Sequence, residues 1–146
     1  MYSKLPRQSH PAPRSILLLA GLLTLIAGAA AQAEDGTTSP VAQEIAMAAN
    51  HAGLAAMSPD LKTLRMHLHH TLNCLAGPNG MGYDASQANP CQGLGMGALM
   101  DSSPEAKGFI QAAAAKADTA LKTDNLPIAR NEAVELKSFL EKKDAH

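Results

Sequence analysis

The stretch from Leu61 to Pro78, LKTLRMHLHHTLNCLAGP, decides the fold class of this chain. Leucine returns every third or fourth residue, at Leu61, Leu64, Leu68, Leu72 and Leu75. This spacing places the leucines on one face of an α-helix, as in a helix that packs against others. Gly77 and Pro78 follow at the point where helices commonly end. The pattern predicts a helix from Pro59 to about Ala76, with Ser58 of the Ser58-Pro59 pair as its N-cap.

Three further helices are predicted from similar signals. Ser-Pro pairs, and Asp124-Asn125 before Pro127, supply an N-cap followed by a proline in the first turn, where its missing N–H costs nothing. The helices cover residues 40–57, 104–123 and 126–143, and their apolar residues again recur at helical spacing. The sequence therefore predicts an all-α fold, a four-helix bundle with a long glycine-rich connection, residues 77–102, between its second and third helices.

The first 33 residues are typical of a cleavable signal peptide. Lys4, Arg7 and Arg14 give a basic start, residues 16–27 are largely apolar, and Ala31-Gln32-Ala33 provides a small-residue cleavage site. The apolar run is shorter than the roughly 20 residues of a membrane-spanning helix. We expect cleavage after Ala33, with Ala31 as the alternative. Residues 34–146 would then reach the periplasm or the medium as a single domain without a membrane anchor.

Removal of this segment makes the chain more acidic. The whole chain has 12 basic and 13 acidic residues, and the segment contains three of the basic residues and none of the acidic ones. The exported part then has a formal charge of −4. An acidic surface disfavours nucleic acid as a partner, because phosphate binding needs lysine and arginine.

Cys74 and Cys91 are the two cysteines of the chain. In an oxidising compartment an even pair most simply forms a disulfide, which would tie the glycine-rich connection to the second helix. On the chain-entropy model this bond contributes about 3 kcal/mol. A free thiolate that binds a metal is the alternative. We interpret the connection as a disulfide-stapled lid beside the second helix, with a purely structural loop as the other interpretation.

The residues with the clearest chemistry are Met66–His70, MHLHH, on the predicted second helix. A helix turns by about 100° per residue, so His67 and His70 share one flank, while His69 falls on the opposite flank with Asn73. Met66 precedes His70 by one turn and lies near it. At most two of these three histidines can therefore meet one ion from within this helix.

His51 offers a third ligand from the predicted first helix, which runs antiparallel to the second. We predict a metal site of His51, His67 and His70, completed by Met66 or by a methionine of the glycine-rich connection. Imidazole is the commonest metal-binding side chain, and thioether ligands suit Cu(I), so we expect copper ahead of zinc or nickel. The alternative is that the histidines are solvated and the methionines fill the core.

The stretch from His67 to Pro78, continued by Tyr83-Asp84 and Pro90-Cys91, resembles a group of uncharacterised exported bacterial proteins. The plan is also similar to the small periplasmic metal-binding proteins, which are histidine-rich helical bundles. That resemblance implies metal binding in the periplasm. Those proteins carry histidines on all their helices, whereas here the third predicted helix has none and the end of the chain adds only His146. The departure favours a single site over a high-capacity store.

Three functions fit these features. The first is an exported protein that binds or carries a metal ion and is not an enzyme, since the sequence offers no nucleophile–base pair. The second is a bundle that holds haem through Met66 and a histidine as axial ligands. The haem would be non-covalent haem b, because no C-x-x-C-H motif for covalent attachment is present. The third is a cofactor-free module that contacts another periplasmic protein through its loop and its exposed methionines.

Overall fold

Five helices make up the part of the chain that the computed structural model describes, residues 38–142. They are α1 (Pro40–Met57), α2 (Leu61–Ala76), α3 (Ala98–Asp101), α4 (Pro104–Lys122) and α5 (Leu126–Glu141). Within these residues the only β-structure is an isolated bridge between Gln92 and Gly95. The predicted all-α fold is confirmed. The predicted signal peptide, its cleavage site and His146 lie outside the described residues.

The start of α2 differs from the prediction. The sequence predicts Ser58 and Pro59 as the cap and first residue of this helix, and this is wrong. Asp60 caps α2 instead, and its Oδ1 accepts a hydrogen bond from the Thr63 N–H at 2.8 Å. Ser58 closes α1, because its hydroxyl donates to the Leu54 carbonyl at 2.9 Å. A serine that closes one helix is not free to cap the next, so the start moves to the carboxylate that follows.

One turn of helix, α3, lies within the connection that the sequence predicts to be irregular. Gly97 precedes this turn with a φ of 104°. Its carbonyl accepts hydrogen bonds from the N–H groups of Met100 at 2.8 Å and Asp101 at 3.1 Å. Ala98 is fully buried in the core. The burial of Ala98 and the hydrogen-bonded turn therefore hold this segment in place. Neither feature could be recognised in the sequence, because the surrounding glycines break any helical pattern.

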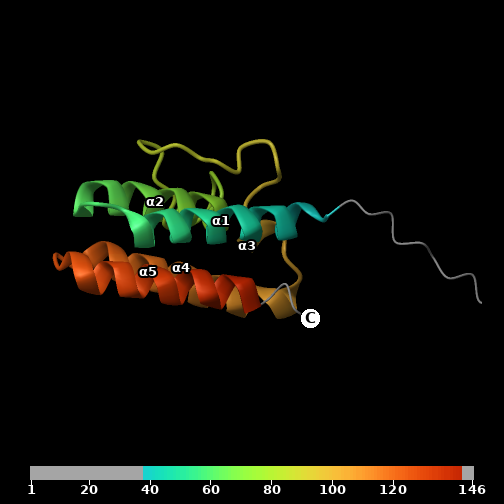
Figure 1. Cartoon of the computed structure of the whole chain (residues 1–146). Helices are drawn as coiled ribbons and strands as arrows, with labels where there is room; N and C mark the ends of the chain where they lie inside the picture. The colour runs from blue at the N-terminus through green and yellow to red at the C-terminus, as the bar shows by residue number, and fades with distance from the viewer. Residues whose placement is uncertain (1–37, 143–146) are drawn as a thin grey trace, which may run out of the picture. The chain divides into compact units, whose positions relative to one another are not determined.

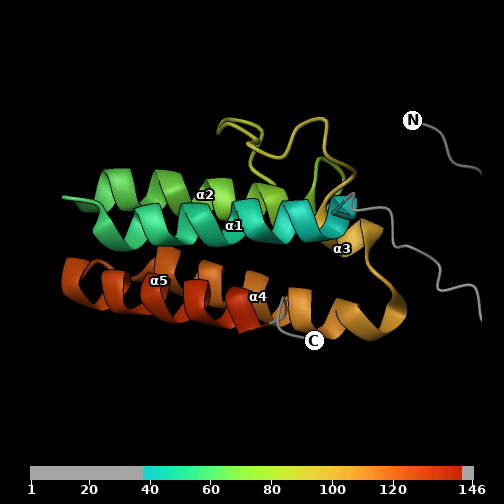
Figure 2. The same cartoon turned by 45° about the vertical axis from the view of Figure 1, so that its right-hand side comes forward.

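α1 and α2 lie side by side in one layer, and α4 and α5 lie side by side in a second layer (Figure 1; Figure 2). α1 contacts α2 and α5, and α4 contacts α5 and α2. The core between the layers is mainly leucine and alanine at the predicted stripe positions, among them Ala48, Ala52, Leu64, Leu68, Ala117 and Leu136. Small side chains at the contacts let the helix axes approach closely.

The residues between α2 and α3, 77–97, form a loop on the face of the α1–α2 layer that is turned away from α4 and α5 (Figure 1). We call it the stapled loop, because the Cys74–Cys91 disulfide ties it to α2. Both cysteines are buried, and the predicted pairing is confirmed. Gly77 and Gly97 close the base of the loop, since a Cβ on either residue would collide with backbone atoms of the other segment.

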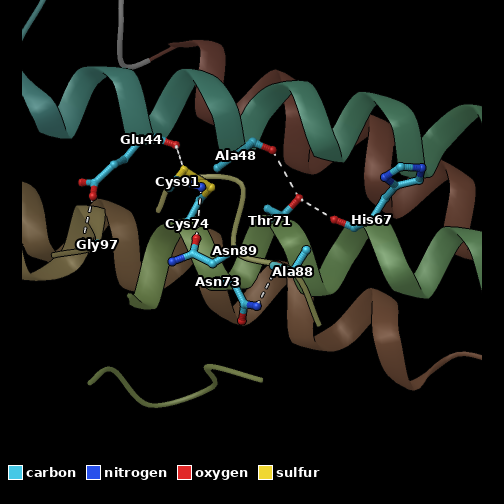
Figure 3. Close-up of a disulfide and its surroundings, with 10 residues drawn as sticks. All are labelled: Glu44, Ala48, His67, Thr71, Asn73, Cys74, Ala88, Asn89, Cys91 and Gly97. Atoms are coloured by element: carbon cyan, nitrogen blue, oxygen red, sulfur yellow. Dashed lines mark hydrogen bonds between the residues drawn. A yellow bond between two sulfur atoms is a disulfide. The ribbon is translucent and has the colours of Figure 1, made fainter. Parts of the chain in front are cut away.

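Asn73 of α2 fixes the middle of the stapled loop. Its side chain accepts a hydrogen bond from the Asp84 N–H at 2.8 Å and donates to the Asp84 carbonyl at 3.0 Å. It also donates to the Ala88 carbonyl at 3.0 Å (Figure 3). Asn73 is itself fully buried.

None of the helices in residues 38–142 combines the length and the apolarity that a membrane crossing requires.

Candidate metal centre

Three histidines from the first layer meet on one face of it. His51 comes from α1, and His67 and His70 come from α2. The ring centroids are 5.6 Å apart for His51 and His67, 5.0 Å for His51 and His70, and 5.8 Å for His67 and His70. One nitrogen from each ring lies within 4.8 Å of the other two. The predicted meeting of these three side chains is confirmed, and the cluster can hold a metal ion.

The two helices reach this arrangement through the leucine stripe and one buried hydroxyl. Leu68 follows His67 and points into the core, so His67 and His70 fall on its flank beside α1. Thr71 is fully buried one turn beyond His67. Its hydroxyl lies 3.1 Å from the His67 carbonyl and 3.2 Å from the Ala48 carbonyl of α1 (Figure 3). This contact fixes the register of α1 against α2, and with it the position of His51.

The environment of all three imidazoles favours their uncharged form. Burial, followed by the nearby His70 and His67, lowers the pKa of His51 to about 4. Burial also lowers the pKa of His67. For His70 burial again comes first, and His67 and His69 then lower its pKa through charge repulsion. A neutral imidazole is the form that binds metals, so protons compete weakly for this site.

Two of the nitrogens in the cluster already face each other. His51 Nδ1 lies 3.3 Å from His67 Nδ1, so that one of the two rings donates an N–H to the other. His70 Nδ1 is buried and makes no hydrogen bond within the described residues. A buried polar atom without a partner costs about 1–3 kcal/mol. A cation bound by the cluster would satisfy such nitrogens.

His69 of α2 is not part of this group of three, and Met66 directly precedes His67 in the chain. His69 Nδ1 is 3.4 Å from Asp84 Oδ2 of the stapled loop, on the flank that the sequence predicts for it together with Asn73. Met66 is partly exposed and lines a surface hollow with His69 and Gln87. Its role as an additional metal ligand stays a prediction. Among the other described methionines, Met57, Met81, Met96 and Met100 are exposed.

Sequence reasoning missed two buried polar residues next to the stapled loop, Glu44 and Asn73. Glu44 is the only acidic residue of α1, and it lies one helical turn from Val41 and from Ala48 on the stripe that faces inward. That position was the available signal, because an acidic residue on an apolar stripe needs a polar partner. Asn73 gives a weaker signal, its place beside Cys74.

Comparisons with protein-family models, with curated proteins and with solved structures gave no match to this chain.

Proposed function

We propose that this chain is an exported metal-binding protein that binds copper through His51, His67 and His70. The observation that carries the proposal is the convergence of one nitrogen from each of the three rings within 4.8 Å. An ion that binds imidazole at about 2.0–2.1 Å with tetrahedral angles holds two nitrogens about 3.3–3.4 Å apart. The Nδ1 atoms of His51 and His67 are 3.3 Å apart, which suits such an ion.

Copper is the metal that the ligand types favour. Imidazole binds copper, zinc and nickel, and copper binds most tightly of the three in the general affinity order. Met66 precedes His67 directly and would add the thioether that suits Cu(I). Binding or carriage of the ion, rather than catalysis, is the proposed role. Haem is less favoured, because the histidines lie on the face of the first layer and the core is filled with leucine and alanine.

Export is supported by independent features. The predicted signal peptide directs residues 34–146 to an oxidising compartment. The Cys74–Cys91 disulfide persists in such compartments and is rare in the cytosol. In the periplasm the proposed copper site would consist of three neutral imidazoles and would contain no reduced thiol.

The test is to express the full chain with its own leader in a bacterium and to purify it from the periplasm. Mass spectrometry then gives the N-terminus and the bound metal, and a competition titration gives the copper affinity. We expect an N-terminus at Glu34 and one copper ion per chain, with the affinity reduced at least a hundredfold in His67→Ala/His70→Ala. His69→Ala is the matched control, because it removes a histidine from the same helix outside the cluster.

Three outcomes would overturn the proposal. Copper binding that survives the double substitution, or that is lost equally in His69→Ala, contradicts the site. A Soret absorption band selects the haem alternative. A protein that takes up no metal even after reconstitution selects the cofactor-free interaction module.

A further inference from the structure

A buried carboxyl group faces the base of the stapled loop, away from the three histidines. Glu44 of α1 is fully buried, seven residues before His51. Its Oε1 accepts a hydrogen bond from the Gly97 N–H at 2.9 Å (Figure 3). Its Oε2 is buried and makes no hydrogen bond within the described residues. A lone carboxylate in such a place is costly, because burial removes the water that stabilises its charge.

A second carboxyl group converges on the same point. Asp101 of α3 accepts a hydrogen bond on Oδ2 from the Met96 N–H at 2.7 Å. Gly95 lies against both acids, because a Cβ there would collide with Asp101 Oδ2 and would come within 2.9 Å of Glu44 Oε1. Two carboxyl groups therefore meet over a residue that has no room for a side chain.

A carboxyl group that is buried beside a second carboxyl group does not easily keep a negative charge and favours its protonated form. Burial raises the pKa of Glu44 above its ordinary value. The hydrogen bond from Gly97 opposes this effect, and the nearby charge of the Asp101 carboxyl raises the pKa further. A protonated Glu44 can donate to Asp101, which removes the repulsion between them.

The surrounding elements offer Glu44 no positive partner within residues 38–142. No hydrogen bond or ion pair joins it to a cationic side chain. Beyond His70, α2 adds only the disulfide-bonded Cys74. The titratable side chains on the neighbouring segments are His51 on α1, Tyr83 and Asp84 in the stapled loop, Glu105 and Lys107 at the start of α4, and Lys137 and Glu141 at the end of α5.

A proton explains this pair better than a hard cation does. Calcium takes six to eight oxygen ligands, whereas here two carboxyl groups converge and each already accepts a backbone N–H. Among the described residues, the only group of three or more His, Cys, Asp or Glu side chains arranged to hold a metal is the histidine cluster.

We propose that Glu44 holds a proton that it donates to Asp101, and that the pair acts as a pH-dependent latch that holds the base of the stapled loop against α1. With the proton in place, Glu44 binds both Asp101 and the Gly97 N–H. When the proton leaves, two adjacent carboxylates repel each other and the segment from Gly95 to Asp101 opens from α1. The latch therefore closes at lower pH and loosens as pH rises, independently of the proposed copper site.

The direction follows from proton linkage. In the opened loop, Glu44 would have a pKa near the ordinary 4.5, and in the closed loop its pKa is raised. The closed form thus binds the proton more tightly, and its advantage falls by about tenfold per pH unit between these two values. Above the raised pKa the advantage is lost and the opening equilibrium becomes independent of pH.

The test is amide hydrogen exchange in the exported protein, read at Met96 and Gly97 by NMR and corrected for the intrinsic exchange rate at each pH. We expect the protection of both amides to fall as pH rises above 4.5 and then to level off. Glu44→Gln should keep both amides protected at every pH, because a glutamine amide accepts from Gly97 and donates to Asp101 without a titrating proton. Glu105→Gln, an exposed acid at the start of α4, is the control and should leave the profile unchanged.

Several results would overturn the latch. One is protection that does not vary with pH in the unaltered protein, and another is a Glu44→Gln profile identical to it. Protection that rises with added calcium in the unaltered protein, but not in Glu44→Gln, would replace the proton by a cation. If Glu44→Gln does not fold, Asp101→Asn replaces it, and ¹³C NMR follows the pH titration of the Glu44 side-chain carbonyl. Because Asp101→Asn changes the group that accepts the proton from Glu44, it must change both the amide protection and this titration.

Discussion

The two layers of the domain are built from different kinds of contact. In residues 38–142, the fully or largely buried polar side chains belong to α1, α2 or the connections, namely Glu44, Ser58, Thr71, Asn73 and Ser102. The buried residues of α4 and α5 are all apolar, and most of them are alanine. The histidine cluster and the disulfide also belong to the first layer. Buried directional bonds therefore fix the layer that holds the candidate site, while the interior of the α4–α5 layer is held by apolar packing.

The largest effect that separates the layers should come from the disulfide. Cys74→Ala/Cys91→Ala should lower the free energy of unfolding by about 3 kcal/mol, because the unfolded chain regains the entropy of an open loop. Alanine suits these positions, since both cysteines are buried. Chemical denaturation gives the loss in stability. Hydrogen exchange should show lost protection first in the stapled loop and the end of α2.

The same measurement on the reduced, unaltered protein is the control, because it breaks the bond without changing a side chain. If amide protection were lost first in α4 and α5, the result would contradict the proposed difference between the two layers. It would mean that the apolar layer, and not the stapled one, depends on the disulfide.

The next effect tests the apolar layer. Ala117 on α4 is fully buried, so Ala117→Leu should force extra volume into a close helix contact and cost about 2 kcal/mol. In a domain of about 100 residues this corresponds to a fall in Tm of roughly 8–16 °C. Copper stoichiometry should stay the same, because the cluster lies in the other layer. Ala112→Leu, at an exposed position of α4, is the control and should change Tm little.

Periodicity made much of this structure predictable. The leucines of α2 gave its inward face, and the same arithmetic placed His67 and His70 together and His69 with Asn73 on the other flank. The meeting with His51 followed once α1 and α2 were taken as antiparallel neighbours. The start of α2 was not predictable from the Ser58-Pro59 pair, because the Ser58 hydroxyl is used at the end of α1 and Asp60 caps α2 instead.

Long-range polar contacts were the part that the sequence could not supply. Glu44 meets Gly97 across 53 positions of the chain, through a loop whose glycines carry no periodic signal. Asp101 joins them from a single turn of helix that is too short to be recognised by its pattern. Such contacts depend on the path of the stapled loop, which the disulfide and Asn73 determine together.

Acid should weaken the first layer through His51. Its pKa of about 4 in the folded protein lies below the ordinary 6.5, so the unfolded chain binds the proton more readily. The free energy of unfolding should therefore fall as pH drops from 6.5 toward 4. We expect a loss of about 1 kcal/mol, because solvent screens a half-exposed group.

Glu44 titrates in the opposite sense to His51, but it is present in both the unaltered protein and His51→Gln. Its effect therefore cancels when the two proteins are compared, and the difference gives the loss due to His51. Denaturation at pH 7 and pH 5, with metal removed by a chelator, should show the greater loss in the unaltered protein. Equal losses in the two proteins would mean that burial of His51 does not oppose its protonation.

The smallest effect should come from the hydroxyl that joins α1 to α2. Thr71→Val keeps the shape of the side chain but removes the contact with the carbonyls of Ala48 and His67. Both carbonyls lie inside helices, where they retain their backbone partners, so the loss of stability should be below about 1 kcal/mol. Copper affinity should nevertheless fall severalfold, because the register that brings His51 to His67 is no longer fixed by a directional bond.

Thr71→Ser distinguishes positioning from packing. It restores the hydroxyl and loses a methyl group, so it should recover copper affinity while remaining less stable than the unaltered protein. If Thr71→Ser instead binds copper as weakly as Thr71→Val, packing and not the hydrogen bond sets the register. The first layer would then be held in the same way as α4 and α5, and the contrast between the two layers would reduce to the loop and the histidines that one of them carries.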